Sequence, residues 1–150
     1  MPSEHLITRQ IEFVDTDMAG IMHFSNFFRM MEAAETAFFR SLGLPLFEEH
    51  GGQIVGWPRV RASCDYHSPL RFGDTVEVHL FVKEIRIRAV NFFFRFRKRA
   101  PDGTTVAIAR GELTTVCATV DTATNEITSL PLPEVVLAKL EVAPKEAYRF

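Results

Sequence analysis

The chain has 150 residues, 47% of them hydrophobic, and a formal net charge of -2 at pH 7. This length suits one domain covering residues 1–150, and the apolar fraction is enough for a packed core and argues against disorder. The small net charge provides no overall attraction to nucleic acid or to an anionic membrane surface.

The first residues, MPSEHLITRQIEF, lack an apolar core and include Glu4 and Arg9, so we expect no signal peptide. The sequence contains no run of about 18 apolar residues, so no membrane span is predicted. We expect a cytoplasmic protein with no membrane partner. The two cysteines, Cys64 and Cys117, lie far apart without a CxxC pair or a His-rich spacing. We therefore expect ordinary buried thiols, with neither a disulfide framework nor a zinc site.

The first part of the chain predicts a strand, a loop and one long helix. Residues 6–14 mix Ile, Phe and Val with polar residues, which is typical of a strand. The segment DTDMAGIMH at 15–23 has no periodicity and indicates a loop. From Phe24 to Leu42 apolar residues recur at helical spacing, and Gly43 follows where a helix end favours a left-handed residue. We expect a deeply packed helix of roughly 16–18 residues.

Strand patterns dominate the rest of the chain. Residues 53–66 predict one strand with an irregularity at Gly56 and Pro58. Three long strands follow, at 75–85, 90–99 and 104–121. The last of these is too long to run flat, so we expect a bulge at Gly111.

This order of elements predicts an α+β fold in which an antiparallel sheet wraps around the helix. Residues 127–140 add a short strand and a terminal helix, and 137–150 are expected to form a loosely ordered tail. One helix covers only one face of a sheet, and alternation places Phe81 and Phe93 on the other face. We therefore expect these two side chains to be buried against a partner chain, so that the protein is not a monomer.

The loop before the helix concentrates residues with chemical potential. Asp15 and Asp17 lie two apart, Gly20 follows, and His23 stands next to the helix start. Backbone N–H groups at a helix start can stabilise an oxyanion, so a carboxylate beside them could form a hydrolase site. Aspartates before helices are more often caps or turn formers, and on these grounds alone both interpretations stay open.

Two separated motifs resemble one known family. The segment RQIEFVDTDMAGIMHFSNFFRMMEAAETAFFRSLGLP is similar to the opening of the 4-hydroxybenzoyl-CoA thioesterase family, which includes the YbgC-like acyl-CoA thioesterases. The family signature D-x-D-x-x-G-[IV], followed by an aromatic or His pair and N-[YF], is matched here by Asp15-Thr16-Asp17, Gly20-Ile21, His23-Phe24 and Asn26-Phe27. The family's Y-x-x-P-x-R-x-G-D stretch is matched by Tyr66-His67-Ser68-Pro69-Leu70-Arg71-Phe72-Gly73-Asp74. The resemblance covers roughly residues 7–120 and is specific for the family, though not for a substrate.

The resemblance implies a hotdog fold, in which a five- or six-stranded antiparallel sheet wraps a long central helix. It also implies homodimers or homotetramers with active sites between subunits. Asp17 becomes the catalytic carboxylate, either as a nucleophile that attacks the thioester or as a general base that deprotonates water. The backbone N–H of Phe24 becomes the oxyanion donor, and Asp15 is expected to be structural. His23 stands one place earlier than the histidine of YbgC-like members, so a functional role and a capping or packing role both stay open.

Arg86 and Arg88 form a second candidate site, because benzoyl-type relatives carry basic residues here that meet the phosphates of CoA. Seven basic residues fall within 17 positions around them, and the alternatives are a solvated strand edge or nucleic acid. The interleaved phenylalanines follow strand alternation, so we expect no nucleic-acid partner. Trp57, Phe27 and Phe28 could line an acyl pocket, with core packing as the alternative.

We therefore predict an acyl-CoA thioesterase that hydrolyses an acyl- or aroyl-CoA to the free acid and CoA. No metal or redox cofactor is implied, since CoA is part of the substrate. A thioesterase for acyl carrier protein and a non-catalytic acyl-CoA-binding module are the alternatives, and a dehydratase is disfavoured because no His-plus-acid hydratase motif is present. Glu32 and Glu35 are rival carboxylates, because other hotdog thioesterases place a catalytic Glu on the central helix.

Overall fold

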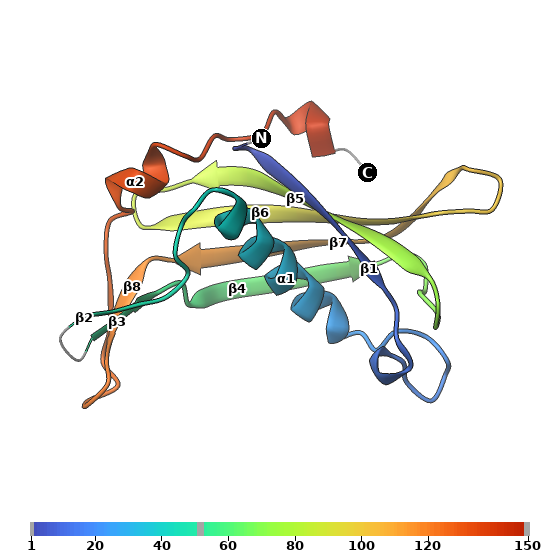
Figure 1. Ribbon diagram of the computed structural model, residues 1–150, viewed down its shortest axis with the longest axis horizontal. Coiled ribbons are helices and arrows are strands. Elements are labelled where there is room, and N and C mark those ends of the chain that lie inside the picture. Colours follow the sequence, from blue (N-terminus) through green and yellow to red (C-terminus); the bar gives the residue numbers. More distant parts are fainter. Residues whose placement is uncertain (1, 51–52, 149–150) are drawn as a thin grey trace.

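The structure, a computed structural model, describes residues 2–50 and 53–148. A five-stranded antiparallel sheet in the order β1-β5-β6-β7-β4 curves around one long helix, α1 (Asn26–Ser41) (Figure 1). The strands are β1 (Glu4–Gln10), β4 (Arg59–Tyr66), β5 (Thr75–Ile85), β6 (Ala89–Arg99) and β7 (Thr105–Val116). The predicted hotdog fold is confirmed. Within the described residues, no helix is long and apolar enough to cross a bilayer.

A second, smaller sheet extends one end of the first, in the order β2-β3-β8-β9. Its strands are β2 (Glu48–His50), β3 (Gln53–Gly56), β8 (Ala118–Asp121) and β9 (Ile127–Ser129). The irregularity predicted at Gly56 and Pro58 is confirmed as a break between two strands, so the predictions of continuous strands at 53–66 and 104–121 were wrong. Both strands break at the same level, between β3 and β4 and between β7 and β8, where the Val116 N–H donates to the Pro58 carbonyl oxygen at 2.9 Å. Pro58 has no N–H for a ladder, so the paired strands leave the large sheet there together.

Gly111 lies in the middle of β7 without the predicted bulge. It pairs in regular register with Cys64 on one side and Phe94 on the other, and the register shift between β6 and β7 lies instead between Phe96 and Arg97. A Cβ atom at Gly111 would overlap the side-chain end of Met31 and lie 3.0 Å from the Ser63 carbonyl oxygen. Glycine is needed here because α1 approaches the sheet closely.

The core fills the space between α1 and the concave face of the sheet. Val76, Val78, Leu80 and Val82, which the alternation places on one face of β5, are all fully buried. Phenylalanines from α1 and β6 fill the same layer, namely Phe27, Phe38, Phe39, Phe92, Phe94 and Phe96. The first strand ends at Gln10, before the predicted limit of residue 14, because residues Phe13–Asp15 form a 3-10 turn.

The chain's own C-terminal segment covers the part of the convex face that is formed by β5 and β6. After α2 (Glu134–Leu137), this segment crosses β5 and β6, drawn in red in Figure 1, and Ala143, Ala147 and Tyr148 pack on Phe81 and Phe93. Phe81 and Phe93 are 1% and 9% exposed. The expectation that a partner chain buries these two side chains was wrong, because residues 143–148 of the same chain bury them. These residues belong to the tail that was expected to be loosely ordered, and its last positions, 149 and 150, lie outside the described residues.

Candidate active site

A cavity of about 560 Å³ lies at the N-terminal end of α1, where the two sequence motifs meet. The Met22 N–H donates to the Leu70 carbonyl oxygen at 2.7 Å, and Ile21 and Arg71 form an isolated β-bridge. The cavity is lined by Asp17, Ile21, Met22 and Phe24 from the loop, Phe27 from α1, Tyr66 at the end of β4, and residues 67–71 after it. Asp17 and Phe24 are thus brought together, as the resemblance predicts.

Asp17 sits in a tight loop that fixes half of its carboxylate. Its Oδ1 accepts the Ala19 N–H at 2.8 Å and the Ile21 N–H at 3.5 Å. The turn closes through Gly20, whose φ of 79° favours glycine. Among the described residues nothing donates to Oδ2, so one carboxylate oxygen lining the cavity is held and the other is available.

Phe24 lines the cavity and carries a backbone donor that the local fold does not use. Its N–H has no acceptor within the described part of the chain, although neighbouring groups are bonded. The Asn26 N–H donates to the His23 carbonyl oxygen at 3.0 Å, and the His23 N–H donates to the Asp15 carbonyl oxygen at 2.9 Å. A fixed, unpaired N–H beside a carboxylate can stabilise an oxyanion.

Asp15 has the structural role that the sequence analysis expects. Its Oδ2 accepts the Glu12 N–H at 2.9 Å, and its carbonyl oxygen accepts the Asn26 side-chain amide at 2.8 Å. His23 is also tied into the local fold, because its Nδ1 lies 2.7 Å from the Ser25 hydroxyl and its ring stacks on Phe24. His23 does not line the cavity, which favours its capping and packing role.

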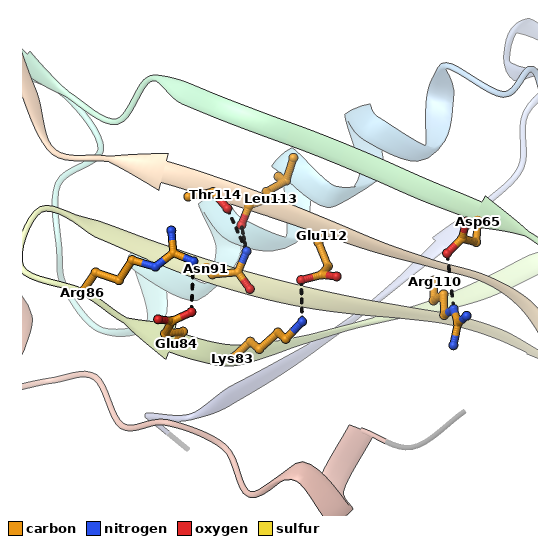
Figure 2. Close-up of polar contacts among 9 residues, drawn as sticks. All are labelled: Asp65, Lys83, Glu84, Arg86, Asn91, Arg110, Glu112, Leu113 and Thr114. Atoms are coloured by element: carbon orange, nitrogen blue, oxygen red, sulfur yellow. Dashed lines mark hydrogen bonds and ion pairs between the residues drawn. The ribbon is translucent and has the colours of Figure 1, made fainter.

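Arg86 and Arg88 lie far from this cavity within one chain. They occupy the turn between β5 and β6 at the α2 end of the sheet, whereas the Asp17 loop lies at the N-terminal end of α1 (Figure 1). Arg86 pairs with Glu84 at 3.0 Å, as Figure 2 shows, and Arg88 donates to the Ser129 carbonyl oxygen at 2.8 Å. A single copy therefore does not join these arginines to Asp17.

The basic cluster around these arginines is largely neutralised on the sheet. Four of its seven members form ion pairs among the described residues: Lys83 with Glu112, Arg86 with Glu84, Lys98 with Asp74 and Arg99 with Glu77 (Figure 2 shows the first two). A patch in which most cations have acidic partners is poorly suited to nucleic acid, which needs unpaired phosphate-binding charge.

The candidate pocket aromatics separate into core and cavity residues. Trp57 is buried and packs edge-on against Phe39, with ring centroids 5.3 Å apart, away from the Asp17 cavity. Phe28 is partly buried against the core. Phe27 is buried and also lines the cavity. Of the three, only Phe27 borders the space next to Asp17.

Glu35, one of the rival carboxylates, lies on the buried face of α1 and outside the Asp17 cavity. Its Oε1 lies 3.2 Å from Nη2 of Arg59, yet neither of its oxygens accepts a hydrogen bond from a described residue. Burial raises the pKa of Glu35 to about 7, although the Arg59 guanidinium favours the charged form. Glu32 is exposed, 3.9 Å from Arg59, and also outside the cavity.

Comparison with known proteins connects this geometry to a family. The family model of the thioesterase-like superfamily matches residues 11–140. The chain belongs to this superfamily. The match spans both motifs and four strands of the large sheet, leaving out only β1.

Relatives within the superfamily include named hydrolases of CoA thioesters. A protein of Aquifex aeolicus described as a candidate esterase is 39% identical over 79 residues, which is 51% of this chain and 59% of that protein. The 4-hydroxybenzoyl-CoA thioesterase of Pseudomonas sp. strain CBS-3 is 29% identical over 108 residues, 69% of this chain and 75% of that one. A 1,4-dihydroxy-2-naphthoyl-CoA hydrolase of Prochlorococcus marinus is 29% identical over 113 residues, with the same two coverages of 69% and 75%.

Solved structures of superfamily members agree in fold over nearly the whole chain. The 4-hydroxybenzoyl-CoA thioesterase of Pseudomonas sp. strain CBS-3 gives a TM-score of 0.77 at 21% identity, covering 91% of this chain and 98% of that one. A protein of unassigned function from Aquifex aeolicus gives a TM-score of 0.71 at 29% identity, covering 91% and 99%.

The residues of the second motif were given no role from the sequence, although six of the eleven residues that line the cavity belong to it. Tyr66 is the clearest omission, since its hydroxyl donates to the Phe24 carbonyl oxygen at 3.0 Å. Its position at the start of the second motif, where a predicted strand ends and a loop begins, was visible in the sequence, but its partner lies 42 residues away. A contact at that separation has no local sequence signal.

Proposed function

We propose that the chain is an acyl-CoA thioesterase that hydrolyses an acyl or aroyl thioester to the free acid and CoA. One observation carries the proposal: Asp17 lines the same cavity as Phe24, whose backbone N–H has no acceptor among the described residues. The names of two relatives, a 4-hydroxybenzoyl-CoA thioesterase and a 1,4-dihydroxy-2-naphthoyl-CoA hydrolase, support the reaction class.

The two groups divide the chemistry between them. The Phe24 N–H donates to the thioester carbonyl oxygen and stabilises the negative charge that develops there. Oδ2 of Asp17 then attacks the carbonyl carbon, the C–S bond breaks, and CoA leaves as a thiolate. Water hydrolyses the resulting mixed anhydride to the free acid and restores Asp17. In the second form of the mechanism, Asp17 takes a proton from a water that attacks the carbonyl instead.

The lining of the cavity favours an apolar acyl group. Phe24, Phe27, Met22 and Leu70 supply aromatic and aliphatic surface around Asp17. A volume of about 560 Å³ lies within the range of roughly 300–1,000 Å³ typical of small-molecule sites. The acyl chain or ring would lie on this surface, with the thioester at Asp17.

A homodimer or homotetramer is part of the proposal, now supported by different surfaces from those first expected. Strand β4 is an unpaired edge of the large sheet, and seven of its eight residues are exposed. Exposed apolar side chains lie in the two segments that contribute residues to the cavity, namely Phe13, Val14, Met18, Phe24 and Phe72. Contact between copies would cover these surfaces and could bring Arg86 and Arg88 of another copy to the CoA phosphates. Light scattering should give at least twice 17.1 kDa, and a monomer mass at micromolar concentration would refute it.

The test of function is thiol release from a panel of acyl- and aroyl-CoA substrates, run beside an acyl-carrier-protein thioester and read with a thiol reagent. Release from CoA substrates is the expected result. Faster release from the carrier protein would favour the carrier-protein alternative. Tight acyl-CoA binding without release would indicate a non-catalytic module. The cytoplasmic location and the absence of a cofactor remain predictions. Unchanged rates in EDTA would support the absence of a metal.

A further inference from the structure

Tyr66 connects the large sheet to the backbone beside the catalytic cavity. It is the last residue of β4 and lines the cavity, and its hydroxyl donates to the Phe24 carbonyl oxygen at 3.0 Å. We propose that Tyr66 is a positioning residue, whose hydroxyl holds the Phe24 backbone so that the Phe24 N–H is fixed as the oxyanion donor. This inference rests on the proposed thioesterase function and deepens it.

The two peptide groups on either side of the Phe24 Cα atom are held by different contacts. The peptide that carries the Phe24 N–H is held at its other end, where the His23 carbonyl oxygen accepts the Asn26 N–H at 3.0 Å. The next peptide carries the Phe24 carbonyl, and among the described residues only the Tyr66 hydroxyl donates to that oxygen. Its N–H, from Ser25, makes only a long contact of 3.3 Å with the His23 ring.

Phe24 has little else to keep it in place. Its side chain is 62% exposed, and its one ring contact is with His23, a neighbour in the same loop. The anchors of the His23–Asn26 region come from the loop and from α1, whereas Tyr66 comes from the sheet. Among the described residues, the bond from the Tyr66 hydroxyl is the hydrogen bond that joins residues 23–26 to the large sheet; their other bonds go to Asp15 and to the helix start.

Tyr66 is rigid enough to serve as this anchor. Its ring packs edge-on against Phe27 with centroids 5.0 Å apart, and Phe27 packs in the same way against Phe96 of β6 at 5.2 Å. Tyr66 is 46% exposed, and its partial burial, together with the charge of Cys64 and a hydrogen bond to it, raises the pKa of Tyr66 to about 12, so the hydroxyl keeps its proton throughout an ordinary assay range. The ring contact with Phe27 and the hydrogen bond to the Phe24 carbonyl oxygen therefore suit Tyr66 to positioning the backbone.

The test is Tyr66→Phe, which keeps the ring and its contact with Phe27 and removes only the hydroxyl. Losing an oxyanion donor altogether costs about 10²–10³ in kcat, and here the donor remains but is less well fixed, so we expect a loss of about 5- to 50-fold. KM should change less than about twofold, because Tyr66 acts on the transition state and not on ground-state binding. The pH profile of kcat should keep its shape at the lower rate.

Tyr148→Phe is the matched control, since Tyr148 is the only other tyrosine of the chain and packs on Phe81 and Phe93 at the convex face. It should leave kcat and KM unchanged, and the melting temperatures of both variants should stay near that of the parent protein.

Unchanged kcat in folded Tyr66→Phe protein would overturn the inference while leaving the thioesterase function intact. A rise in KM at constant kcat would also overturn it, because Tyr66 would then be a substrate contact. So would loss of the alkaline limb of the pH profile, which would make Tyr66 a general acid. If the parent protein releases thiol from no substrate of the panel, the proposed function fails and this inference fails with it.

Discussion

Replacing Glu35 with Gln should stabilise the protein above neutral pH, which is unusual for removal of a charged group that faces an arginine. Glu35 is fully buried and neither oxygen has a hydrogen-bond donor among the described residues, although Arg59 lies 3.2 Å away. Desolvation therefore outweighs the attraction of Arg59 and raises the pKa of Glu35 to about 7 from 4.5. Gln keeps the size and shape of the side chain and removes the charge.

The size and pH range of the effect follow from this pKa. The folded protein binds the Glu35 proton more tightly than the unfolded chain does, so stability from this group is fully present below about pH 4.5 and is lost as pH rises through about 7. Each pKa unit corresponds to about 1.4 kcal/mol, so the ionised carboxylate costs on the order of 3 kcal/mol above pH 8. Because the Gln amide is itself left without a partner, we expect a net gain of about 1–3 kcal/mol at pH 8 and almost none at pH 5.

Urea unfolding at pH 5, 7 and 8, at one protein concentration, gives the free energy of unfolding of the parent and the Glu35→Gln protein. The contributions of other titrating groups cancel in the difference between the two proteins at each pH. Glu32→Gln is the control, because Glu32 lies 3.9 Å from Arg59 but is exposed, and it should change stability by less than about 0.5 kcal/mol. Arg59 keeps its bond to the Trp57 carbonyl oxygen at 2.8 Å in both variants. Destabilisation of Glu35→Gln by 2 kcal/mol or more at pH 8, roughly the loss expected on breaking a net-favourable buried pair, would refute the reasoning.

Two further substitutions test the packing of α1 and the role of the basic turn. Gly111→Ala should cost about 1–3 kcal/mol of unfolding free energy, because its Cβ overlaps the Met31 side chain; an unchanged urea midpoint would contradict the close approach. Replacing both Arg86 and Arg88 with Ala should raise KM for acyl-CoA and weaken its salt dependence, with less effect on kcat. No change with CoA or carrier-protein substrates would mean that these arginines form a solvated edge.

Local patterns in the sequence were sufficient for the central helix and for strands β5 and β6. Apolar spacing from Phe24 to Leu42 predicted α1 to within two residues at its start, and strict alternation along β5 predicted which side chains are buried. These signals work because the periods of helix and strand differ and one face of each element is buried. The motif resemblance added the loop of Asp17, which the structure places beside Phe24.

Features that depend on distant contacts could not be predicted in the same way. The covering of Phe81 by Tyr148 and the pairing of Glu35 with Arg59 join residues that are far apart in the chain, and no local pattern marks either contact. The bulge expected at Gly111 was wrong for a related reason, since a strand glycine marks either a bulge or a close approach, and only the position of α1 decides between them.

The thioesterase activity of Asp17→Asn protein, measured beside Asp15→Asn, tests the central claim most directly. Asn keeps the size of Asp17 and removes the charge that both chemical roles need, so kcat should fall at least about 100-fold, in line with general base catalysis. Asp15→Asn should lose stability more than rate, because Asp15 holds the Glu12 N–H. Melting temperatures of both variants separate lost chemistry from lost structure. Near-normal turnover in folded Asp17→Asn protein, above all if Glu35→Gln is inactive, would contradict the account.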